Sequence, residues 1–316
     1  MDHALLALAQ NIGLTALDVG ARGGVNTDLG PVAEATKYVG FEPDAVECAR
    51  LQNAGIGGGW KQVQFVPVAL ADYEGTFDLN LYSKRGCSSK YRARQDLGKL
   101  FCRGEFYNLD QIVKVPCSRL DDVLHKEGIL EPAFMKIDVQ SMEVEVFNGA
   151  PRTLKEDLVG IRTEVSFFPM YEEQPLFAEI DQRVRQDGFV PMRWLENHEW
   201  RRATGKKPYS MADGPLPFSR GQLMHADVLY LLHPEALPTN DEKSLRRLVR
   251  LGLVASCYQH YDHAMAAFAR PYVRQLCQDQ WKIDPFKAVE RMSQAEVTLT
   301  RRLAWRLMKT LQKNFA

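Results

Sequence analysis

The chain has 316 residues, of which 45% are hydrophobic and 25% are charged, the composition of an ordinary folded protein. Its 40 Lys and Arg residues balance its 40 Asp and Glu residues, so the net charge gives no reason to expect a nucleic acid or an anionic membrane as partner. The six cysteines form no CxxC pair and no zinc-finger pattern, and residues 1–13 do not resemble a signal peptide. We therefore expect a cytoplasmic protein with free thiols and no membrane span.

Residues 14–24, "LTALDVGARGG", predict a β-strand followed by a glycine-rich loop. A dinucleotide site typically has the spacing GxGxxG, whereas this loop has GxxGG, and a carboxylate at Asp18 would repel a pyrophosphate. The same carboxylate could accept an ammonium group as a hydrogen-bonded ion pair. S-adenosyl-L-methionine carries an ammonium group and no phosphate, so we expect Asp18, Gly20, Ala21 and Gly24 to bind this cofactor.

The next two strands are expected to complete the cofactor site. The motif "YVGFEPD" ends the second strand at Glu42, and an acid at this tip hydrogen-bonds the ribose hydroxyls in folds of this class. Pro43 stops the strand and fixes the turn, which argues against an ordinary solvated glutamate. The run "VQFVPVALAD" predicts a third strand, and its tip at Ala69 and Leu70 should lie beside the adenine.

An insertion follows at about residues 73–118, before the fourth strand. Its segments "FDLNLYS" and "IVKVPCSRL" alternate between apolar and polar residues as strands do. An inserted lobe over the carboxyl edge of the sheet would shape a substrate pocket. The basic segment 84–94 suggests a phosphorylated or acidic acceptor, although a solvated loop would explain the same charges.

The remaining strands are predicted at "PAFMKIDV", "LVGIRTEVSF", "FVPMRWLE" and "ADVLYLLHP". The loop at 201–222 leaves no room for a crossover helix, so the last strand, at 226–234, should run antiparallel to the strand before it. Strands that alternate with helices indicate an α/β fold with a mostly parallel sheet. A seven-stranded sheet with the last strand antiparallel is the architecture of the Rossmann-like class I methyltransferase fold, here expected over residues 1–236.

Residues 237–316 predict an all-helical C-terminal extension. Residues 244–272 vaguely resemble one tetratricopeptide helix pair, but a single repeat cannot form a solenoid, so a packed helical hairpin is the preferred interpretation. The final predicted helix, at 296–313, is amphipathic and basic. We expect it to dock on its own protein or on a twin subunit in a homodimer, in preference to a membrane surface.

Taken together, these motifs resemble the FkbM-type methyltransferases. "DVGARGG", "GFEPD", "VALADYEGT", the serine pair at 88–89, "RLDD", "MKIDVQSMEVEVFNGA" and "TEVSFFPMY" occur in the order of that family over residues 14–235. The family transfers a methyl group from S-adenosylmethionine, typically to a hydroxyl of a sugar or natural product. Two departures are visible: Arg22-Gly23-Gly24 replaces the usual Asn-Ile-Gly, and Ser141-Met142 stands where the family commonly has glycine.

The resemblance implies a set of catalytic residues at the fourth and fifth strands. Asp138 should lie where acceptor and methyl donor meet, either as a base for the acceptor hydroxyl or as a cap of the next helix. Gln140 should hold the acceptor, and Glu164 is the second candidate base. Ser88 and Ser89 belong to the substrate loop.

Metal binding and two other functions are the alternatives to this prediction. Asp138, Glu143 and Glu164 could hold Mg²⁺, but no histidine accompanies them in sequence and no metal is expected. A nicotinamide-dependent oxidoreductase would use a similar sheet, although the GxGxxG motif is absent. A third hypothesis is a methyltransferase-fold protein with little activity that works through partner binding by its helical extension. The leading prediction is methylation of oxygen on a small-molecule or glycan acceptor.

Overall fold

The computed structural model describes residues 1–54, 59–203 and 218–297. Its main sheet has seven strands in the order β3-β2-β1-β7-β8-β10-β9. β10 is antiparallel to both of its neighbours, whereas the other pairs are parallel, so the predicted sheet with a reversed last strand is confirmed. The strands span β1 Leu14–Val19, β2 Thr36–Phe41, β3 Gln62–Val66, β7 Phe134–Ile137, β8 Gly160–Ser166, β9 Phe189–Trp200 and β10 Gln222–Leu232.

The third predicted strand is wrong in its extent. β3 ends at Val66, and the chain turns at Pro67, which has no N–H to continue the ladder. Ala69 and Leu70, further along the same run, form β4, which belongs to a second sheet. β9 and β10 are also longer than predicted, because they pair with each other as far as Trp200 and Gln222.

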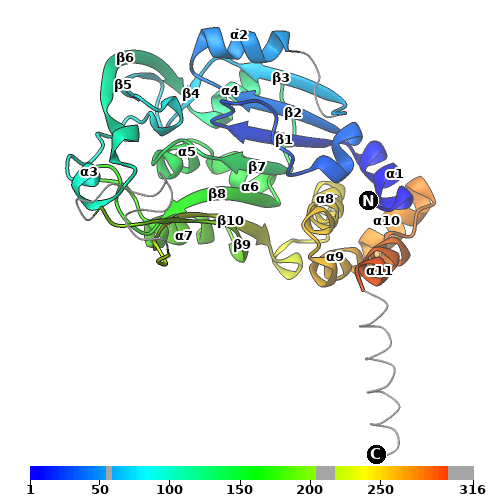
Figure 1. Ribbon diagram of the computed structural model, residues 1–316. Coiled ribbons are helices and arrows are strands. Elements are labelled where there is room, and N and C mark those ends of the chain that lie inside the picture. The colour runs from blue at the N-terminus through cyan, green and yellow to red at the C-terminus, as the bar shows by residue number, and fades with distance from the viewer. Residues whose placement is uncertain (55–58, 204–217, 298–316) are drawn as a thin grey trace, which may run out of the picture.

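The second sheet forms the inserted lobe (residues 73–118), together with β4. Its order is β4-β6-β5, with β5 at Gly75–Tyr82 and β6 at Leu109–Ser118. The two strands predicted within the insertion are therefore confirmed. Figure 1 shows the lobe at one end of the main sheet and the C-terminal helices at the other.

Short helices connect the strands. The segment after the glycine-rich loop is a six-residue 3₁₀ helix, η1, with Pro31 in its first turn. The α-helices of the sheet domain and lobe are α1 His3–Ile12, α2 Ala45–Asn53, α3 Leu97–Leu100, α4 Leu120–Lys126, α5 Glu143–Asn148, α6 Pro151–Glu156 and α7 Phe177–Arg185. The 3₁₀ segments are η1 Gly30–Ala35, η2 Arg85–Cys87, η3 Gly104–Tyr107 and η4 Pro234–Ala236.

Within the described residues, four α-helices follow β10: α8 Glu242–Cys257, α9 Tyr261–Phe268, α10 Pro271–Trp281 and α11 Pro285–Glu296. Their buried residues belong to the same hydrophobic cluster as those of the main sheet. The guanidinium of Arg247 on α8 donates to the backbone carbonyls of Leu154, Lys155 and Leu158 at 2.6–3.2 Å, which fastens the extension to the end of α6. The predicted final helix lies almost entirely outside the described residues. Within the described parts of the chain, no helix is long and apolar enough to cross a bilayer.

Candidate active site at the carboxyl edge of the sheet

A cavity of about 620 Å³ opens between the carboxyl edge of the main sheet and the inserted lobe. Its lining brings together eight of the residues predicted from sequence: Gly20, Glu42, Pro43, Ala69, Leu70, Ser88, Asp138 and Gln140. Because parallel strands end at a shared edge, residues far apart in sequence meet there. Five other predicted residues do not line the cavity: Asp18, Ala21, Gly24, Ser89 and Glu164.

The glycine-rich loop is in close contact with the loop that follows β7. Gly20 has φ +85°, and a Cβ at this position would lie 2.0 Å from the carbonyl oxygen of Asp138, so glycine is required on both conformational and steric grounds. The backbone N–H groups of Gly20 and Ala21 donate to the carbonyl of Phe41 at 3.1 Å. These bonds tie the loop to the tip of β2 and leave the side chain of Ala21 buried below the cavity.

Asp18 lies beneath the cavity and not in it. Its carboxylate accepts hydrogen bonds from Tyr38 and from Asn26, the latter at 3.0 Å, and Lys136 Nζ lies 3.4 Å away. Burial raises the pKa of Asp18 in spite of the ammonium of Lys136. Both hydrogen bonds go to Oδ2, whereas Oδ1 has no hydrogen-bond partner. That Asp18 faces the cofactor's ammonium group stays a prediction.

Glu42 occupies the tip of β2, as predicted, and its side chain lines the cavity although only 3% of the residue is exposed. Its Oε1 accepts the backbone N–H of Asp44 at 2.9 Å. Arg22 reaches over from the glycine-rich loop, with Nη1 3.8 Å from Glu42 and Nη2 3.6 Å from Asp44. Burial raises the pKa of Glu42.

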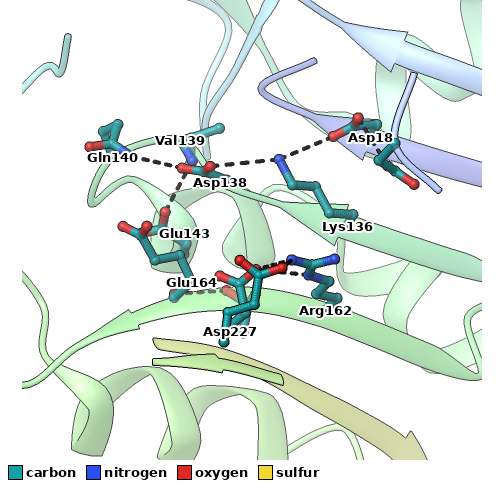
Figure 2. A network of polar contacts seen from close by, with 12 residues as sticks. Asp18, Lys136, Asp138, Val139, Gln140, Glu143, Arg162, Glu164 and Asp227 are labelled. Atoms are coloured by element: carbon teal, nitrogen blue, oxygen red, sulfur yellow. Dashed lines mark hydrogen bonds and ion pairs between the residues drawn. The ribbon is translucent and has the colours of Figure 1, made fainter. Parts of the chain in front are cut away.

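Asp138 lines the cavity at the end of β7, where Figure 2 shows it between Gln140 and Lys136. Its Oδ1 accepts from Gln140 Nε2 at 2.8 Å, and its Oδ2 lies 3.7 Å from Lys136 Nζ. The helix-cap alternative for Asp138 is not borne out, because α5 starts after Met142 and no side chain caps it. That Asp138 acts as the base for the acceptor hydroxyl stays a prediction.

Gln140 joins the sheet edge to the lobe. Its Oε1 accepts from the Tyr171 hydroxyl at 2.9 Å, and its carbonyl accepts from the Ser89 hydroxyl at 2.6 Å. Gln140 and Ser141 have φ values of 53° and 90°, the region that favours glycine. Ser141, which replaces the usual family glycine, keeps this backbone form, and its hydroxyl is buried without a hydrogen-bond partner. The substitution preserves the turn at a cost in stability.

Lys136 is a site residue that the sequence analysis missed. It lies on β7 directly opposite Asp18 in the register and bridges Asp18 and Asp138 (Figure 2). Burial alone would lower its pKa, but the carboxylates of Asp138 and Asp18 outweigh that effect and raise it. Lys136 therefore stays positively charged and compensates the negative charges of Asp18 and Asp138 at the carboxyl edge of the main sheet.

Glu143 and Glu164 do not line the cavity; Glu143 is buried, and the Glu164 side chain is 13% exposed. Glu143 Oε1 accepts from the backbone N–H of Val139 at 3.1 Å and of Ser141 at 3.4 Å, and burial raises its pKa to about 8. Glu164 Oε2 lies 3.0 Å from His225 Nδ1, and burial together with the charge of Asp138 raises its pKa well above the usual range. The hydrogen bonds of Glu143 stabilise the turn that contains Gln140. Glu164 lies instead beside His225. Within the described ranges, no three such side chains gather as metal ligands.

The strand order and the cavity at its carboxyl edge are those of a Rossmann-like methyltransferase. The family model of the methyltransferase FkbM domain matches residues 18–191. The chain therefore belongs to the FkbM methyltransferase family, which decides against the oxidoreductase hypothesis. No curated protein matches the chain.

Several solved structures are similar at low identity. A methyltransferase FkbM from Methylobacillus flagellatus KT is 11% identical with a TM-score of 0.33, and the match covers 70% of this chain but only 44% of that one. A precorrin-6y C5,15-methyltransferase from Geobacter metallireducens GS-15 is 9% identical, with a TM-score of 0.31 and coverage of 72% and 87%. A TehB-like SAM-dependent methyltransferase from Corynebacterium glutamicum ATCC 13032 Kitasato is 10% identical, with a TM-score of 0.28 and coverage of 73% and 89%.

Proposed function

We propose that this methyltransferase uses S-adenosyl-L-methionine to methylate a hydroxyl oxygen of its acceptor. The observation that carries the proposal is that Glu42 and Asp138 line one cavity from the strands on either side of β1. The first is an acceptor suited to a ribose diol, and the second is a carboxylate suited to an acceptor hydroxyl. Methyl transfer to oxygen needs both groups within reach of one ligand pair.

The cavity fits the cofactor by the chemistry of its lining. Glu42 would accept the ribose hydroxyls, and the apolar side chains of Val68, Ala69 and Leu70 would cover the adenine. The lining carries three acids and two arginines, which suits a cofactor with a cationic end and disfavours a pyrophosphate. Bound there, S-adenosylmethionine supplies a methyl group activated by its sulfonium.

The chain's own part in the reaction falls to Asp138 and Gln140. As the acceptor oxygen takes the methyl group, its hydroxyl proton must leave, and Asp138 is the carboxylate of the cavity on the β7 side that can hold it. Gln140 fixes the Asp138 carboxylate through its amide. This arrangement orients one lone pair of Asp138 and keeps the other oxygen beside Lys136.

Binding of S-adenosylhomocysteine, measured by isothermal titration calorimetry, tests the cofactor. Glu42→Ala should weaken it by about 1–3 kcal/mol, because hydrogen bonds to a charged acceptor would be lost. Glu34→Ala is the matched control, since Glu34 is exposed and its carboxylate contacts only Gln10 in the bonds described. Failure of the wild-type protein to bind at millimolar ligand would overturn the proposal. Unchanged affinity in Glu42→Ala would remove Glu42 from the ribose site.

A further inference from the structure

One wall of the cavity is an apolar surface of the lobe. Directly opposed residues of β5 and β6 line it: Phe77 faces Val115, and Leu79 faces Val113. Leu81 extends the same face of β5. We name these five residues the apolar wall.

The apolar wall is more than the packed interior of the lobe. Phe77 and Val115 are buried with Met142, but Leu79, Leu81 and Val113 keep part of their surface exposed to the cavity. The other face of the same strands carries an exposed ion pair, in which Lys114 lies 3.0 Å from Asp78. Exposed aliphatic side chains along a cavity are unfavourable in water, so a ligand that covers them gains binding energy.

The cations of the cavity are already paired. Arg22 faces Glu42 and Asp44, and the guanidinium of Arg85 binds the carboxylate of Asp110. A phosphate or carboxylate on the acceptor would have to displace these acids or enter beside them. The cavity therefore offers no unpaired cation among its described lining residues.

The basic segment 84–94 gives no better support to an acidic acceptor. Besides Arg85, Lys90 lies 3.5 Å from Glu145 and Arg94 binds Asp96 at 2.7 Å. Lys90 and Arg94 are outside the cavity lining, as are Lys84 and Arg92. These charges act within the lobe and at its contact with α5.

We propose that the acceptor is an uncharged molecule in which an apolar body, covered by the apolar wall, carries the hydroxyl that is methylated. This inference rests on the proposed function, because it places the acceptor in the same cavity as the cofactor. It excludes a phosphorylated or acidic sugar as the preferred acceptor.

The test measures binding of phenol, 4-ethylphenol, 4-butylphenol and phenyl phosphate by calorimetry, with S-adenosylhomocysteine saturating. Affinity should rise about fourfold for each methylene, as for a buried CH₂ group, and phenyl phosphate should bind no better than phenol. An affinity that does not change with chain length, or tighter binding of phenyl phosphate, would overturn the inference. If S-adenosylhomocysteine does not bind the wild type at all, the proposed function fails, whereas the alkylphenol series without it still reports on the wall.

Val113→Asn and Ile112→Asn are the matched pair of variants. The two residues are neighbours on β6, but Val113 lines the cavity and Ile112 lies on the opposite face with 48% exposure. Val113→Asn should reduce the gain per methylene to less than twofold and leave the affinity for S-adenosylhomocysteine within twofold of wild type. Ile112→Asn should change neither. A Val113→Asn protein that binds S-adenosylhomocysteine more weakly would show that the wall covers the cofactor, contrary to the inference.

Discussion

The substitution Glu143→Gln should remove a large part of the pH dependence of stability. Glu143 is 2% exposed, and its pKa is raised to about 8 by burial and then by the charge of Glu164. Between pH 4.5 and 8 the folded protein therefore holds a proton that the unfolded chain has released. Stability from this group is complete below pH 4.5 and is lost as the pH rises through about 8.

The size of the effect follows from the shift. One pKa unit corresponds to about 1.4 kcal/mol, so the difference between 4.5 and about 8 amounts to roughly 4–5 kcal/mol of unfolding free energy lost over this range. Glutamine retains an oxygen for the N–H groups of Val139 and Ser141 and has no proton to lose. The free energy of unfolding of the wild type minus that of Glu143→Gln should thus decrease steadily from pH 5 to 8.

Urea denaturation followed by tryptophan fluorescence at pH 5.5, 6.5, 7.5 and 8.5 measures this difference. Glu34→Gln, at an exposed position, serves as the control and should follow the wild type. Glu164→Gln should lower the pKa of Glu143 and so shift the loss to lower pH. A difference between wild type and Glu143→Gln that stays constant across the four pH values would refute the reasoning.

Three further changes test the site and the packing. Asp138→Asn should reduce methyl transfer by roughly a hundredfold or more, the range for one proton-transfer group, and leave S-adenosylhomocysteine affinity nearly unchanged; near-normal turnover would move the base to Glu164. Gly252→Ala places a Cβ 2.4 Å from the Phe268 ring and should cost about 1–3 kcal/mol in urea unfolding, as overpacking does, whereas equal or greater stability would contradict the close contact. Removal of residues 241–316 uncovers the apolar face that α8 buries and should cause aggregation in size-exclusion chromatography; a soluble, active truncated protein would show that the extension is an independent partner-binding unit.

The sequence predicts the strand tips better than the side-chain partners. The carboxyl ends of buried parallel strands lie at one edge of a sheet. The predicted strands alone therefore place Glu42 and Asp138 at the same edge. Asp18 also ends a strand, but its partners Tyr38 and Lys136 are 20 and 118 positions away, so no local pattern showed which groups its carboxylate contacts. Pro67 is a local indication that β3 ends at Val66. The apolar residues on both sides of Pro67 nevertheless favour a single longer strand.

The packing of the inserted lobe has a consequence for how such an enzyme can diverge. Among the described residues, the main hydrophobic cluster passes from Leu70 directly to Leu120, and the buried side chains of the lobe belong to two smaller clusters, one shared with Met142 and the other with Trp200 of β9 and Met224 of β10. Substitutions in the lobe therefore leave the main cluster intact and reach the main sheet only through the ends of β9 and β10. The residues around an acceptor can drift from lineage to lineage while the strand tips that carry Glu42 and Asp138 stay under an unchanged constraint.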